Sequence, residues 1–148
     1  MPNGGERGPQ TERRRWIAWI AWIALPLLIA CAGNDPATQI ERAGSWAATT
    51  RELAIERRVG AIGRAYTADL LDAGGREVQM IQQSLKPSEL PESIRSRVPI
   101  AVGRLDSVIA NTGSAVRRGD VVALGMAAAD ANALSDTLRV LRAALVGK

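Results

Sequence analysis

The chain has 148 residues, a formal net charge of +4, no histidine and a single cysteine, which fits one small domain. The absence of histidine removes the commonest general base and transition-metal ligand, and one cysteine excludes an internal disulfide or a Cys-based zinc site, so we expect no catalysis and no cofactor. Beyond residue 30 the basic and acidic residues nearly balance and only Trp46 and Tyr66 are aromatic, so we also expect no nucleic-acid binding.

Residues 1–30 have the organisation of a signal peptide. A polar segment ends in Arg13-Arg14-Arg15, and an apolar run of 18 residues then extends from Trp16 through Gly33. A membrane-spanning helix needs about 17–25 such residues. The length of the run therefore leaves open whether this segment is cleaved or spans a membrane.

A shorter motif at the end of this run bears on that choice. Leu28-Ile29-Ala30-Cys31 contains the only cysteine of the chain and resembles the lipobox of bacterial lipoproteins. The resemblance covers residues 1 to about 35. It implies cleavage before Cys31, attachment of a diacylglyceryl group to its thiol, and anchoring in the cell envelope. Because Ala32 stands where an inner-membrane retention signal commonly has Asp, it also implies an outer-membrane anchor that faces the periplasm.

Two alternatives to the lipid anchor remain open. An uncleaved signal anchor would span the inner membrane once, with Arg13-Arg14-Arg15 on the cytoplasmic side. A secreted product without an anchor is the other. The stretch from Arg13 to Ile17 also resembles a twin-arginine export signal, so the sequence does not decide between that route and general secretion.

A helix start follows the cysteine closely. In Asn34-Asp35-Pro36, Asp35 suits the N-cap position and Pro36 suits the first helical position. Residues 31–36 are therefore predicted to be the lipidated cysteine and a short tether, which extends at most roughly 20 Å. Residues 37–148 show helical periodicity without strand alternation, and they are predicted to form the folded domain.

Two positions compete as the end of the first helix. One is Arg57-Arg58-Val59-Gly60, which would give helices of similar length. The other is Gly74-Gly75, because a glycine pair costs about 2 kcal/mol relative to alanine inside a helix. An apolar stripe crosses the first position without a change of phase, which favours a long helix that continues through Val59 and is interrupted at Gly74-Gly75. The stripe consists of Ile55, Val59, Ile62, Tyr66 and Leu70.

The last helix is the best marked. In Arg117-Arg118-Gly119-Asp120, the glycine suits a helix end and the aspartate suits the next N-cap. An apolar seam then repeats in steps of three and four: Leu124, Ala127, Ala131, Leu134, Leu138, Leu141 and Leu145. A flanking set widens this face and favours packing in the protein core, although a homodimer through the 121–146 helix stays open. The set comprises Val122, Met126, Ala129, Ala133 and Val140.

The predicted fold is all-α, a small antiparallel bundle of three to four helices with an Ala/Leu-rich core. No group of residues suits catalysis, since Asp69 and Asp72 near Tyr66, and also Asp130, are expected to be solvent-exposed. We expect a membrane-anchored envelope lipoprotein with a structural, accessory or protein-interaction role. The alternatives are a periplasmic sensor that binds a small ligand, and a single-pass subunit of a membrane complex.

Overall fold

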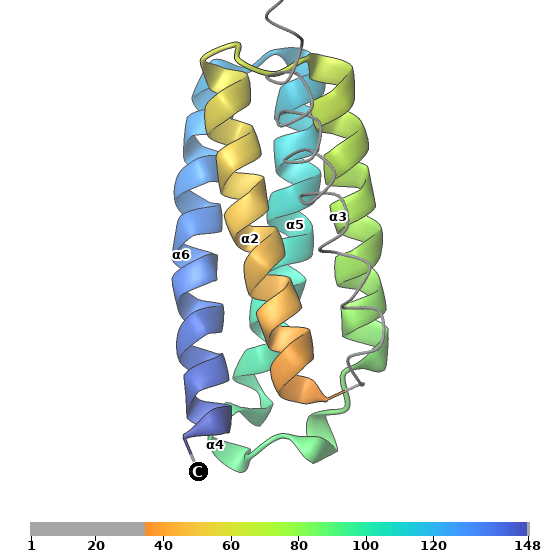
Figure 1. Cartoon of the computed structure of the whole chain (residues 1–148), viewed down its shortest axis with the longest axis vertical. Helices are drawn as coiled ribbons and strands as arrows, with labels where there is room; N and C mark the ends of the chain where they lie inside the picture. Colours follow the sequence, from red (N-terminus) through yellow and green to blue (C-terminus); the bar gives the residue numbers. More distant parts are fainter. Residues whose placement is uncertain (1–34, 148) are drawn as a thin grey trace, which may run out of the picture. The chain divides into compact units, whose positions relative to one another are not determined.

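The computed structural model describes residues 35–147 of the chain. Four long helices run alternately up and down and form a bundle (Figure 1). They are α2 (Pro36–Arg58), α3 (Arg64–Ser84), α5 (Arg97–Arg118) and α6 (Val121–Val146), and the 3-10 turn η2 (Pro87–Glu89) and the short helix α4 (Glu92–Arg95) connect α3 to α5. The described range contains no strand. The predicted all-α antiparallel bundle is confirmed, with four helices.

The start of α2 is the one that the sequence predicted. Pro36 is the first helical residue, and the carboxylate of Asp35 accepts a hydrogen bond from the backbone N–H of Thr38 at 3.2 Å. The first amides of a helix have no partner within it, so this contact satisfies one of them.

The end of α2 differs from the prediction. The helix ends at Arg58, and residues 59–63 lead into α3. The predicted interruption at Gly74-Gly75 is wrong, because both glycines lie inside the continuous helix α3. In the apolar stripe that suggested a longer helix, Val59 is 72% exposed and Tyr66 is 63% exposed. The residues of the stripe have helical spacing in the sequence, but they belong to two helices and the connection between them.

The backbone explains why the chain turns at this point. Gly60 has a φ of 76°, in the left-handed region that other residues avoid. The N–H groups of Gly60 and Ala61 donate to the carbonyl oxygens of Arg57 and Glu56, at 3.2 and 2.9 Å. This pair of hydrogen bonds is a Schellman motif, which satisfies the last carbonyls of a helix and ends it.

Gly74 has a packing role instead of a helix-breaking role. A Cβ atom at this position would lie 2.7 Å from two ring carbons of Trp46 in α2. The missing side chain therefore lets the indole of α2 lie directly against the backbone of α3. At the neighbouring Gly75 the nearest atom would be 3.8 Å away, which is an ordinary contact.

The connection between α5 and α6 confirms the prediction for that segment. Gly119 has a φ of 69°, and the N–H groups of Gly119 and Asp120 donate to the carbonyls of Val116 and Ala115, at 3.2 and 3.0 Å. The carboxylate of Asp120 then accepts from the N–H of Ala123 at 2.9 Å and caps α6. One four-residue stretch thus closes one helix and opens the next.

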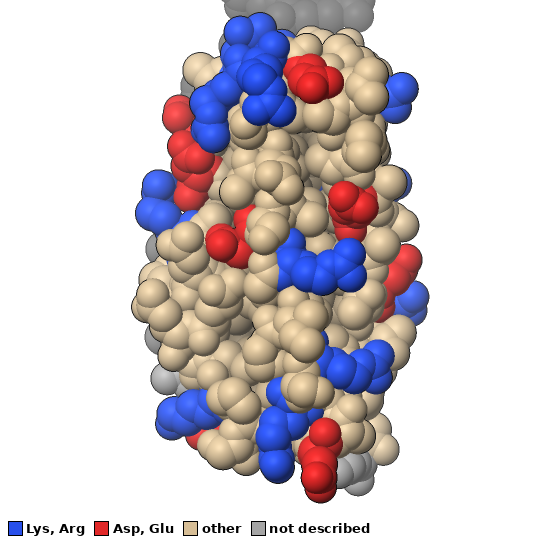
Figure 2. All heavy atoms as spheres, turned by 180° about the vertical axis from the view of Figure 1, so that it is seen from behind, with Lys and Arg blue, Asp and Glu red and all other residues tan. Residues whose placement is uncertain are grey.

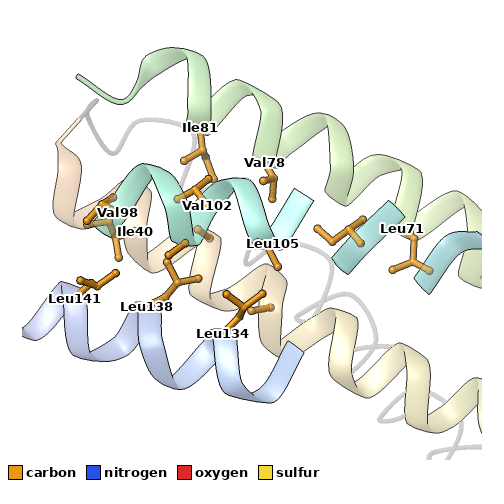
Figure 3. Close-up of a cluster of buried hydrophobic side chains, with 14 of the residues drawn as sticks. Ile40, Leu71, Val78, Ile81, Val98, Val102, Leu105, Leu134, Leu138 and Leu141 are labelled. Carbon is orange, nitrogen blue, oxygen red and sulfur yellow. The ribbon is translucent and has the colours of Figure 1, made fainter. Parts of the chain in front are cut away.

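Alanine and leucine fill most of the contact between α2 and α6, which is the most extensive of the bundle. Ala43, Ala47 and Ala131 are fully buried, and small side chains let the two helices pack closely. Larger aliphatic side chains from all four helices complete the core (Figure 3). They include Ile40, Leu71, Val78, Ile81, Val98, Val102, Leu105, Leu134, Leu138 and Leu141. The predicted Ala/Leu-rich core is confirmed.

The predicted seam of α6 is buried within the bundle from Leu124 to Leu141, so these residues are not available to a second molecule. The prediction that the flanking set widens the buried face of α6 is wrong. Val122, Met126 and Val140 are 75%, 66% and 54% exposed, and Ala129 and Ala133 are exposed as well. They lie about 140° around the helix from the seam at 100° per residue, so α6 carries two separate apolar rows and not one wide face.

Candidate functional site

The predicted lipidation site, Cys31, and the predicted signal peptide lie outside the described residues. Within residues 35–147, none of the helices is long and apolar enough to cross a membrane. The functional features that the structure can place are therefore those on the surface of the bundle.

The acidic residues that the sequence singled out do not form a site. Asp69 and Asp72 are exposed near the start of α3, and Asp72 forms an ion pair with Arg117 of α5 at 3.7 Å. Asp130 and Asn132 are exposed on α6. Exposed pairs of this kind contribute at most about 1 kcal/mol. These placements confirm the prediction that the carboxylates are solvated.

The described residues hold no group of three or more His, Cys, Asp or Glu side chains that would suit a metal ion. Three buried threonine hydroxyls have their own structural explanation. Thr50, Thr67 and Thr112 each donate to the backbone carbonyl four residues earlier, at 2.7–2.8 Å. Hydrogen bonds of this local type satisfy a buried hydroxyl without any ligand.

A groove of about 320 Å³ lies between α3 and α5. Gly75 of α3 and Gly113 of α5 both line it, a feature that the sequence did not predict. Two acids and two bases line it, Asp72 and Asp106 with Arg76 and Arg117; its other lining residues are Leu71, Gln79, Ile109 and Ala110. The groove thus offers both charges to a small molecule, but the side chains of Asp72 and Arg117 are more than half exposed, so water competes strongly.

One end of the bundle is rich in arginine. The two connections that close it, residues 57–66 and 117–122, contain five arginines and one acidic residue. Figure 2 shows basic side chains gathered over this end. Several of them serve the fold: Arg57 donates to the carbonyl of Ile62 at 3.1 Å, and Arg117 pairs with Asp72. Arginine also stabilises the last turn of a helix, so the cluster is explained by helix ends and is not by itself a binding site.

The remaining feature is the outward face of α6. Five of the nine large hydrophobic side chains that are exposed in the described residues belong to this helix: Val121, Val122, Met126, Val140 and Val146. The helix carries only four charged residues in its 26 positions, namely Asp130, Asp136, Arg139 and Arg142. Three of them, Val122, Met126 and Val140, lie on one side of the helix, and exposed apolar residues that are grouped in this way are typical of an interaction surface.

No protein-family model, curated protein or solved structure matches this chain. The proposed function therefore rests on the motif that ends at Cys31, on the short tether of residues 31–36 and on the surface of the bundle.

Proposed function

We propose that this chain is a bacterial envelope lipoprotein whose helical bundle is a non-catalytic interaction module. The observation that supports this proposal most directly is the motif Leu28-Ile29-Ala30-Cys31, which ends an apolar segment that follows three arginines. Two or three acyl chains on Cys31 would anchor the protein durably, since each buried methylene contributes about 0.8 kcal/mol. Ala32 favours the outer membrane, with the bundle facing the periplasm.

The position of the bundle in the chain supports this proposal. Helix α2 begins at Pro36, five residues after Cys31, and Asp35 caps it. A tether of this length keeps the domain within roughly 20 Å of the lipid surface. A protein held so close to a membrane suits contact with other envelope components.

The anchor is tested by intact-mass analysis of the protein from the membrane fraction. We expect a chain that starts at Cys31 and carries the added mass of its lipid. The matched control is Cys31→Ser, which should retain residues 1–30 and gain no lipid. A wild-type protein that keeps residues 1–30 without lipid would contradict the anchor and support the single-pass alternative. An unmodified chain in the soluble fraction would support secretion.

The interaction role is tested by co-purification after gentle detergent solubilisation. We expect the protein to elute with a defined envelope protein, at a fixed ratio that survives a change of detergent. A monodisperse protein without any partner in several detergents would contradict this role.

The groove between α3 and α5 supports a second candidate function, the binding of a small zwitterion. Asp106 and Arg76 offer opposite charges across the groove, as the carboxylate and ammonium groups of an amino acid would require. Because a ligand that binds only the folded state stabilises it, free amino acids at millimolar concentration should raise the melting temperature. Asp106→Asn should abolish that rise. If no amino acid changes the melting temperature, this second function is wrong.

A further inference from the structure

Five exposed apolar residues on one side of α6 form a row that we call the outer strip: Val122, Met126, Ala129, Ala133 and Val140. Their steps of four, three, four and seven residues keep them on one side of the helix, opposite the buried seam. The only charged residue in the same row is Asp136, and Arg139 holds its carboxylate at 3.2 Å. The strip therefore faces solvent with little charge along its length.

Apart from Met126, which lies level with Asp136, the strip is symmetric about the level of Ala131. Val122 and Val140 lie nine residues before and after this position, and Ala129 and Ala133 lie two residues before and after it. In an antiparallel pair of α6 helices with a two-fold axis at this level, Val122 of each copy meets Val140 of the other. A self-complementary patch is what a two-fold dimer requires. The alanines at the centre allow the axes to approach to about 8 Å.

The charges around the strip favour the antiparallel direction. A parallel pair would place the two arginine-rich ends side by side, with Arg118 of one copy near Arg118 of the other. An antiparallel pair separates these ends by the length of the bundle. It also places Asp130 opposite the neutral Asn132.

We propose that the outer strip of α6 binds the same strip of a second copy of this chain, antiparallel, about a two-fold axis at the level of Ala131. This interface differs from the dimer that the sequence suggested, because the seam of α6 is buried in the core and the strip lies on the opposite face.

The size of the strip indicates a weak dimer. The strip spans about 27 Å at 1.5 Å per residue and is about 10 Å wide, so it buries on the order of 300 Å² per copy. Stable interfaces bury about 1,200 Å² or more in total. In solution the dimer should therefore depend on concentration. This step rests on the proposed function: a lipid anchor confines the copies to one membrane surface and raises their effective concentration, which favours the dimer.

Disulfide cross-linking between differently tagged copies in membranes tests the geometry. We expect efficient cross-linking of Val122→Cys with Val140→Cys, and of Ala129→Cys with Ala133→Cys. Two copies of Val122→Cys should not cross-link, since their residues lie about 27 Å apart along the axis. The matched control is Ile100→Cys, which is 63% exposed on α5 and away from the strip.

The outcomes separate the dimer from the anchor. A parent protein that cross-links through Cys31 itself has an unmodified thiol there, which contradicts lipidation and says nothing against the strip. Cross-linking of Val122→Cys with itself would overturn the antiparallel arrangement. Yields no higher than for the Ile100→Cys control would overturn the interface.

Sedimentation equilibrium of the detergent-solubilised full chain gives a second readout. Ala133→Glu places two like charges close to the axis and should raise the dissociation constant at least tenfold, with an unchanged circular dichroism spectrum. The matched variant Ala48→Glu changes an exposed alanine of α2 and should have no effect. Equal association of both variants would contradict the proposal.

Discussion

Single atoms decide the role of the glycine pair in α3. Gly74 and Gly75 are adjacent and have helical backbone conformations, yet their surroundings differ. At Gly74 the indole of Trp46 occupies the space that a Cβ atom would need, whereas Gly75 has room for one.

Replacing each glycine by alanine should therefore give opposite results. Gly75→Ala should stabilise the protein by about 0.5–1 kcal/mol, because alanine restricts the unfolded chain and favours the helix. Gly74→Ala should instead destabilise it by about 1–3 kcal/mol, because the rigid indole must move. Urea denaturation measures both free energies of unfolding.

A double-mutant cycle with Trp46→Ala checks the cause. In that background Gly74→Ala should lose most of its penalty, since the ring that obstructs the methyl group is gone. A penalty that persists without the indole would show that the contact is not responsible.

Helix ends are decided by backbone geometry at two glycines. Gly60 and Gly119 both have positive φ, and each closes its helix with the same pair of hydrogen bonds. The arginines in the last turns of α2 and α5 add a favourable charge to the same ends. These local interactions place both turns at one end of the bundle.

The connection between α2 and α3 offers a matched test of this geometry. Gly60→Ala should cost about 1 kcal/mol, because a residue with a Cβ atom is strained at a φ of 76°. The control Gly103→Ala should be neutral or slightly stabilising, because Gly103 lies inside α5 and does not have a positive φ. Neither added methyl group would meet another atom within 4 Å, so steric contacts do not contribute to the difference in stability between the two variants. Equal thermal unfolding of the two variants would contradict the role given to Gly60.

At the scale of the whole molecule, α5 packs against each of the other three long helices, as α2 also does. Its buried residues cover nearly half of the helix circumference, from Ala115 on one edge through Leu105 to Gly113 on the other. Along this face α5 provides most of the contact between α3 and the rest of the bundle. Loss of a large side chain from it should weaken all of these contacts together.

Two isoleucines of α5 test this arrangement. Ile109 is 3% exposed and Ile100 is 63% exposed. Ile109→Ala should destabilise the protein by about 2–5 kcal/mol, because it removes buried methylenes and leaves a cavity. Ile100→Ala should change the free energy of unfolding by less than about 0.5 kcal/mol. Similar losses for both variants, measured by urea denaturation, would mean that α5 is not the centre of the core.

The sequence by itself determined the helical class, the cap at Asp35, the turn at Gly119 and the buried seam from Leu124 to Leu141, because capping residues and apolar spacing act within a few residues. Only the tertiary structure decided the rest. It showed that Gly74 receives an indole from another helix, so that the glycine pair does not interrupt α3. It also placed the outer strip of α6 in solvent and opened the groove beside Gly75. Each of these depends on which helix lies next to which, and periodicity along one helix does not contain that information.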